Sequence, residues 1–156
     1  MEASIVNPFI EGALYILDTT ASLKARPVAP FLKKTSVAAG DISGVLEMTG
    51  DISGSVSITF TEKCILGIVS AMFGEEMTEM DEEITDAVGE IGNMISGRVT
   101  TKMTEMGKVV KIKLHEVKSG KGHTIEHTAL EDDEDKKVLA LPFETTKGNM
   151  IIEICY

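Results

Sequence analysis

The sequence predicts an α+β fold, in which an antiparallel sheet of about six strands packs against helices on one face. Two patterns lead to this prediction, because segments with helical periodicity and segments that alternate as strands follow one another. Their order, one helix and three strands, then two helices and three or four strands, indicates a pseudo-repeat of two halves. At 156 residues, 43% of them hydrophobic, the chain has the size and composition of one domain, residues 1–156.

The first helix is predicted to begin near Pro8. Apolar residues recur at helical spacing from there to Leu17, proline suits a first helical turn, and Asn7 suits the N-cap. Beyond Pro30 the chain is expected to be extended from Phe31 to Ala38.

A β-hairpin is predicted from a repeated pentapeptide. Gly-Asp-Ile-Ser-Gly at 40–44 recurs at 50–54, where it supplies the turn. After the second copy Val56, Ile58 and Phe60 alternate with polar residues, which indicates a half-buried strand. The lysine and the spacing of a phosphate-binding P-loop are absent, so a turn is the preferred interpretation.

Two helices are predicted next. Residues 64–73 are apolar on nearly every side and are expected to be buried, with Gly74 closing the helix. The longest helix is expected to begin at Asp81 and to end near Met106, followed by Gly107.

The remaining sequence predicts strands. Val109–Leu114 and His123–Leu130 are candidates, and Glu131–Asp135 is expected to be a solvated loop. Lys137–Phe143 and Asn149–Ile154 are predicted to pair across a turn.

The longest helix sorts into two faces at about 100° per residue. The face predicted to be buried contains Ile84, Ala87, Val88, Ile91, Ile95, Val99 and Met106. The opposite face contains Asp86, Glu90, Asn93, Gly97 and Thr104. Glu90 and Asn93 are three residues apart, so both side chains can reach one external partner.

Three glycines, Gly89, Gly92 and Gly97, lie around this pair, although each costs a helix about 1 kcal/mol relative to alanine. Gly89 and Gly97 are expected to form an exposed platform that another backbone can approach closely. Ordinary solvated residues with glycines as packing notches are the alternative, and an isolated Glu-x-x-Asn pattern does not exclude it.

The pattern Asp86-x3-Glu90-x2-Asn93 follows a helix and a Gly-Asp-Ile-Ser-Gly hairpin. In order and spacing, these features resemble the CheC/CheX/FliY family of chemotaxis phosphatases, most closely its CheX members. The resemblance covers most of the first 106 residues and includes residues 7–11, 49–56 and 89–97. Leu14 stands three residues after Glu11, so the first helix lacks a second Glu-Asn pair, as in the single-site members.

The resemblance implies a phosphatase that hydrolyses the aspartyl phosphate of a CheY-type response regulator. Asn93 would position the attacking water, and Glu90 would pair with the regulator's active-site lysine. Asp86, Gly89 and Gly97 would contact the partner. No cofactor of its own is expected, and Mg²⁺ is expected in the phosphorylated partner. Glu116 stands where the family usually has a proline, which affects the local strand end.

A non-catalytic docking module for a regulator or signalling partner is the alternative function, which the intact Glu90 and Asn93 disfavour. The family resemblance, together with few charges on the last two strands to guard a sheet edge, also predicts a symmetric homodimer.

The net charge of −10 argues against nucleic-acid and anionic-membrane partners, since both need a basic surface. The N-terminal sequence does not resemble a signal peptide, and two distant cysteines suggest a reduced compartment, so a cytoplasmic location is expected. Cys64 and Cys155 are interpreted as inert core thiols. His123 and His127 are interpreted as solvated strand residues in preference to metal ligands, and no serine-histidine-carboxylate triad is recognised.

Overall fold

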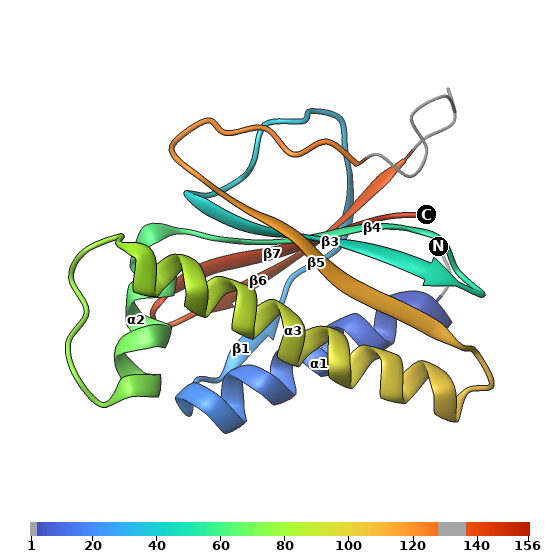
Figure 1. Ribbon diagram of the computed structural model, residues 1–156, viewed down its shortest axis with the longest axis horizontal. Coiled ribbons are helices and arrows are strands. Elements are labelled where there is room, and N and C mark those ends of the chain that lie inside the picture. Colours follow the sequence, from blue (N-terminus) through green and yellow to red (C-terminus); the bar gives the residue numbers. More distant parts are fainter. Residues whose placement is uncertain (1–2, 128–136) are drawn as a thin grey trace.

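A seven-stranded antiparallel sheet carries three helices on one face in the computed structural model, which describes residues 3–127 and 137–156 (Figure 1). The elements are α1 (Ala3–Ala21), β1 (Ala25–Pro27), β2 (Phe31–Lys33), β3 (Ile42–Gly50), β4 (Gly54–Phe60), α2 (Glu62–Phe73), α3 (Glu82–Glu105), β5 (Val110–Ser119), β6 (Val138–Thr145) and β7 (Gly148–Cys155). The predicted α+β class and the placement of the helices on one face are confirmed.

The strand order is β1-β6-β7-β4-β3-β5, and β2 also pairs with β6. This order is symmetric about the centre of the sheet, between β7 and β4. The symmetry relates β1 to β5, β6 to β3, and β7 to β4. The helix α1 precedes β1 as α3 precedes β5. This symmetry agrees with the predicted pseudo-repeat, and the strand that follows the long helix of each half pairs with the other half: β1 with β6, and β5 with β3.

The helix α1 begins at Ala3, before the predicted start, and Pro8 lies inside it. Proline removes the N–H that would bond the carbonyl group four residues earlier, at a cost of about 3 kcal/mol. Ile5 and Val6 are both buried in the core, and burying each contributes about 1.5–3 kcal/mol. Burial therefore offsets the cost, and the helix continues through the proline.

The hairpin of β3 and β4 is confirmed, but its second strand is not half-buried. All residues of β4 are buried, because Val56, Ile58 and Phe60 face the helices while the intervening polar residues are covered by other chain segments. These segments, residues 34–41 and 120–127, cross the sheet face opposite the helices (Figure 1). They are joined by the Val37–Thr124 bridge.

The strand β5 extends beyond Leu114 to Ser119 and contains a bulge opposite the Val45–Leu46 step of β3. His115 is the extra residue, and Glu116 follows it, paired with Val45. Glu116 therefore lies inside a strand and not at its end.

The predicted strand over 123–130 is wrong for its described part, residues 123–127, which contains the single isolated bridge of Thr124. Residues 128–130 and the acidic run 131–135 lie outside the described residues.

The hairpin of β6 and β7 is confirmed, but neither strand is a sheet edge. β6 lies between β7 and the short strands β1 and β2, and β7 lies between β6 and β4. The described edges are instead the β1–β2 side and β5, whose outward positions include Lys111, Lys113 and Lys118. The homodimer was predicted from an unguarded sheet edge in β6 and β7. Both strands are hydrogen-bonded to a neighbour on each side, so neither offers such an edge.

Candidate functional site

The helix α3 is fixed at both ends by local interactions. The Asp81 side chain accepts a hydrogen bond from the Ile84 N–H at 3.3 Å, which makes Asp81 the N-cap. At the other end, Gly107 has φ 83°, a left-handed conformation that glycine adopts without strain. Both predicted ends are confirmed.

The buried face of α3 agrees with the sequence prediction at six positions: Ile84, Ala87, Val88, Ile91, Ile95 and Val99. Met106 was expected there but is 41% exposed, and Met103 is fully buried instead. Met103 lies one turn after Val99 on the same stripe, whereas Met106 is already the C-cap. The predicted exposed face, which includes Asp86, Glu90, Asn93 and Gly97, is indeed exposed.

Glu90 and Asn93 project from this exposed face one turn apart. Within residues 3–127 and 137–156, neither side chain forms a hydrogen bond or an ion pair. The backbone carbonyl of Asn93 accepts a hydrogen bond from Ser96 Oγ at 3.1 Å. An acid and an amide with unused hydrogen-bonding capacity are thus presented together to solvent.

The three glycines have different surroundings. Gly97 is exposed, and an added Cβ would meet nothing within 4 Å, so this part of the surface is open to a partner. Gly89 is buried, and an added Cβ would lie 3.0 Å from Leu114 Cδ2 on β5. The expectation that Gly89 forms part of an exposed platform is therefore wrong, because the position faces β5. Gly92 is also buried, next to Leu46.

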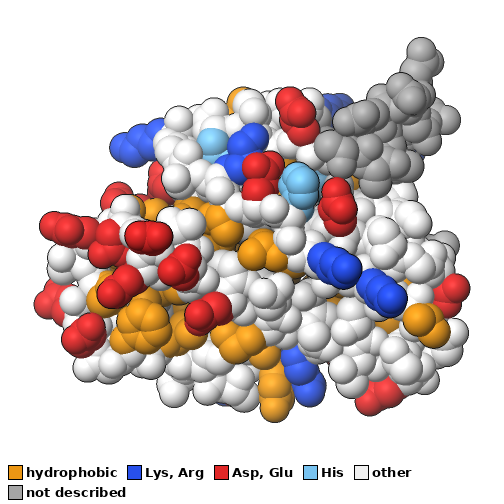
Figure 2. Space-filling model, in the orientation of Figure 1, with side chains coloured by type: hydrophobic (Ala, Val, Ile, Leu, Met, Phe, Trp, Pro, Cys, Tyr) orange, Lys and Arg blue, Asp and Glu red, His pale blue; other side chains and the backbone are white. Residues whose placement is uncertain are grey.

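The charge around the site is strongly polarised. Every charged side chain from Cys64 to Gly97 is acidic: Glu75, Glu76, Glu79, Asp81, Glu82, Glu83, Asp86 and Glu90. Figure 2 shows acidic side chains gathered at the end of the molecule where α2 connects to α3, around exposed hydrophobic surface. Phe73, the last residue of α2, is 47% exposed. A partner at Glu90 therefore approaches past a negative surface, which favours positively charged groups.

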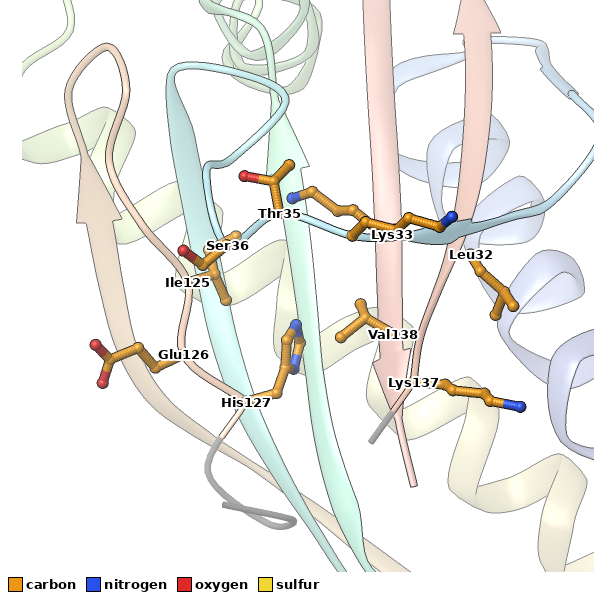
Figure 3. Close-up of a pocket in the computed structure, with 10 residues that line it drawn as sticks. Leu32, Lys33, Thr35, Ser36, Ile125, Glu126, His127, Lys137 and Val138 are labelled. Atoms are coloured by element: carbon orange, nitrogen blue, oxygen red, sulfur yellow. The ribbon is translucent and has the colours of Figure 1, made fainter. Parts of the chain in front are cut away.

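A cavity of about 670 Å³ lies on the other side of the sheet, lined by Lys33, Ile125, His127 and Val138 among others (Figure 3). Beside it Lys33 Nζ donates to Glu153 Oε2 at 2.8 Å, and His127 contacts Glu153 Oε1 at 3.2 Å and Ser55 Oγ at 2.6 Å. Burial alone would raise the pKa of Glu153, but the hydrogen bonds and positive charge of His127 and Lys33 hold it below its ordinary value.

Sequence reasoning missed this buried polar network. The available signal was Glu153 itself, a single acid within the apolar run of β7. The expectation that His127 is solvated is wrong, because its side chain points from the covering segment 120–127 into the sheet and is buried there. His123, in the same segment, likewise contacts Ser43 Oγ through Nε2 at 2.7 Å.

Ser55, His127 and Glu153 have the residue types of a hydrolytic triad but not its accessibility. Ser55 is 2% exposed, so a substrate cannot reach its hydroxyl group. The ring is also reversed relative to a hydrolase triad, since Nδ1 and not Nε2 faces the serine. Lys33 additionally neutralises the acid, so we assign the network to stability.

The described residues give little support for a metal site, a reactive cysteine or a membrane-spanning helix. They contain no group of three or more His, Cys, Asp or Glu side chains placed to hold a metal ion. Cys64 and Cys155 are both buried free thiols, and burial raises the pKa of Cys64 to about 11, which suppresses its thiolate form. None of the described helices is long and apolar enough to cross a membrane.

Comparisons with known proteins identify the family of this chain. The family described as "Chemotaxis phosphatase CheX" matches residues 42–144. The "CheY-P phosphatase CheX" of Thermotoga maritima is 31% identical over 122 residues, which cover 78% of this chain and 79% of that protein.

Solved structures share the fold over almost the whole chain. A CheC-like superfamily protein from a Shewanella species has a TM-score of 0.88 and 39% identity, covering 99% of this chain and 98% of that one. A CheX of Borrelia burgdorferi, solved as a complex with CheY, BeF3 and Mg²⁺, has a TM-score of 0.72 at 20% identity, covering 97% of this chain and 96% of that one.

The helix-covered antiparallel sheet, which the chain shares with the Shewanella protein over almost its whole length, defines a protein of the CheC-like class. Within that class, the matched family and the Thermotoga relative show that this chain belongs to the CheX family of chemotaxis phosphatases. The predicted family and the predicted enzyme class, a protein phosphatase, are both confirmed.

Proposed function

We propose that this protein hydrolyses the aspartyl phosphate of a CheY-type response regulator, using Asn93 and Glu90. The observation that carries the proposal is the pair itself: an amide and an acid one turn apart, exposed, and without partners in the described structure. The printed activity of the Thermotoga relative, a CheY-P phosphatase, supports the substrate class.

In this proposal Asn93 orients the attacking water. Its carbonyl oxygen accepts a hydrogen bond from the water, while its amide group adds no negative charge beside the phosphoryl group. The water oxygen bonds to phosphorus as the bond to the aspartyl oxygen breaks, which yields inorganic phosphate and the free carboxylate. An acyl phosphate is already activated, so positioning of the water supplies most of the rate gain.

Glu90 has a docking role in the proposal. Its carboxylate would repel the phosphoryl group, so we assign it to the regulator's active-site lysine, with which it forms an intermolecular ion pair. Asp86 lies one turn earlier on the same face and adds to the negative potential that attracts this lysine. Gly97 leaves room for the partner's backbone, whereas Gly89 contributes to internal packing.

The divalent cation belongs to the regulator in this account. The Borrelia complex, in which a CheX is bound to CheY with BeF3 and Mg²⁺, supports that placement. Mg²⁺ held there supplies charge neutralisation at the phosphoryl group, and the present chain supplies the water-orienting amide and the docking acid.

Two further expectations belong to the proposal. A cytoplasmic location agrees with the two cysteines, which are free thiols. A homodimer would have to use a surface other than the β6–β7 hairpin, and it must leave Asn93 open on each subunit. Sedimentation of the purified protein measures its oligomeric state.

The test is the decay of a phosphorylated CheY-type regulator with and without the protein. We expect the wild-type protein to accelerate the decay. Glu90→Ala should bind the regulator more weakly and turn it over more slowly, because the intermolecular ion pair is lost. Binding without any acceleration of decay would support a docking module instead, and a loss of turnover with unchanged binding would contradict the docking role of Glu90.

A further inference from the structure

The guanidinium carbon of Arg98, on α3, lies 3.7 Å from the centroid of the Tyr15 ring on α1. This is the geometry of a cation–π contact. Both residues are exposed, and Tyr15 retains 46% of its accessible surface. The contact therefore forms a surface feature that joins the two helices.

A notch in α1 brings the helices close together at this point. A Cβ added at Gly12 would lie 3.3 Å from Val99 Cγ2 and 3.5 Å from Arg98 Cβ, so the α1 backbone packs directly on α3. Tyr15 follows Gly12 by about one turn, which places its ring under Arg98. The close packing thus restricts the stacked pair before any partner binds.

The pair lies beside the proposed catalytic residues. Glu90, Met94 and Arg98 are spaced four residues apart, so they follow one side of α3, and Arg98 is about 12 Å along the helix axis from Glu90. A protein interface of ordinary size buries about 800 Å² per partner, which is wide enough to include both. An interface of that size centred on Glu90 would therefore be wide enough to reach Tyr15 and Arg98.

The charge on α3 changes sign at Arg98. It is the first basic residue after Lys63, and Asn93 lies between it and the acidic end of the helix. Lys102, the next basic residue, lies near Glu11 and Glu105 at 3.8 and 3.9 Å, whereas Arg98 has no ion pair with any described residue. Arg98 is thus available to pair with an acid of a partner, whereas Lys102 already lies near two acids of this chain.

We propose that Tyr15 and Arg98 form a second docking contact, which binds an acidic side chain and an adjacent apolar side chain of the regulator. This inference rests on the proposed function and deepens it, since Glu90 alone does not fix the rotation of the partner. Arginine presents a planar fork that matches a carboxylate, and tyrosine adds rigid apolar surface. Stacking holds the guanidinium in place, which reduces the ordering needed on binding.

The test is a steady-state comparison of KM and kcat, using the phosphorylated CheY-type regulator whose decay the wild-type protein accelerates. Tyr15→Ala and Arg98→Ala should each raise KM by roughly fivefold to thirtyfold, as for interface hot spots, and leave kcat within about twofold. Tyr15→Phe keeps the ring face and should retain the wild-type KM. The double variant should lose less than the product of the single losses, because the two side chains act as a unit.

The chain offers matched controls in its other arginine and its other tyrosine. Arg26 pairs with Glu144 on the β1–β6 side of the sheet, and Tyr156 is the exposed last residue. Arg26→Ala and Tyr156→Ala remove the same groups elsewhere and should leave KM unchanged. Urea unfolding of each variant verifies that the folded fraction is the same.

An unchanged KM in both Tyr15→Ala and Arg98→Ala would overturn the inference. It would leave the proposed function intact, because that function depends on Asn93 and Glu90. A fall in kcat at constant KM would also overturn it, since the pair would then act on the chemistry and not on docking. A third outcome is that Arg98→Ala loses self-association while its KM stays unchanged. This result would show that a second copy of this chain occupies the surface, and it would overturn the inference as well.

Discussion

The ammonium group of Lys33 on β2 lies 2.8 Å from the carboxylate of Glu153 on β7, and the two side chains are only 6% and 2% exposed. The pair ties a three-residue strand near the sheet edge to a strand at its centre, on the face away from the helices. His127 binds the other carboxylate oxygen, so the covering segment 120–127 is held by the same acid.

Removing one partner of this pair should destabilise the fold strongly. Lys33→Met leaves Glu153 buried without its cation, and we expect a loss of about 3 kcal/mol in the free energy of unfolding. The double variant Lys33→Met/Glu153→Leu should recover much of this loss, because no buried charge remains. Urea unfolding at pH 7 measures both. Equal stability of Lys33→Met and wild type would show that the pair contributes nothing.

The same pair predicts an acid-dependent loss of stability. The pKa of Glu153 is held below its ordinary value of 4.5 in the folded protein, so folding favours the charged carboxylate. The stabilisation is therefore complete above about pH 4.5 and is lost as the pH falls through the folded pKa. Glu153→Gln should be less stable at pH 7 and should show a shallower decline in stability below pH 4.5. Parallel stability curves for the two proteins would contradict this assignment.

Gly89 and Gly97, which the sequence predicted to form an exposed platform, should respond differently to substitution by alanine. Gly97→Ala meets open space and should stabilise α3 by about 1 kcal/mol, yet weaken regulator binding because the methyl group projects toward the partner. Gly89→Ala pushes against Leu114 and should bind the regulator as wild type does. Thermal unfolding and regulator titration of both variants are the measurements. Weaker binding in Gly89→Ala alone would reverse the two roles.

Elements whose signals are local could be predicted from the sequence. The helix α3 follows from the Asp81 cap, the apolar stripe and Gly107, all within one segment. The β3–β4 hairpin likewise follows from its turn sequence. The start of α1 could not be predicted in this way, because the burial of Ile5 and Val6 against distant elements outweighs the local effect of Pro8.

The pairing of strands that are far apart in the chain could not be predicted from the sequence. The three-residue strands β1 and β2 pair with β6, more than a hundred residues later, and this pairing places β6 inside the sheet. The cover over Ser55 and His127 has the same origin, since segments far apart in sequence meet above β4. The exposed Glu90–Asn93 pair was predictable because helix periodicity alone separates the two faces of α3.

The most direct test of the account is the decay rate of a phosphorylated CheY-type regulator in the presence of Asn93→Ala. Asn93 is exposed and its side chain has no partner in the described structure, so the substitution should leave the free energy of unfolding unchanged. Titration with the regulator loaded with BeF3 and Mg²⁺ reports binding separately from chemistry. We predict near-normal binding with the decay rate reduced to that of the regulator alone. Accelerated decay at the wild-type rate in Asn93→Ala would contradict the central claim that this amide positions the attacking water.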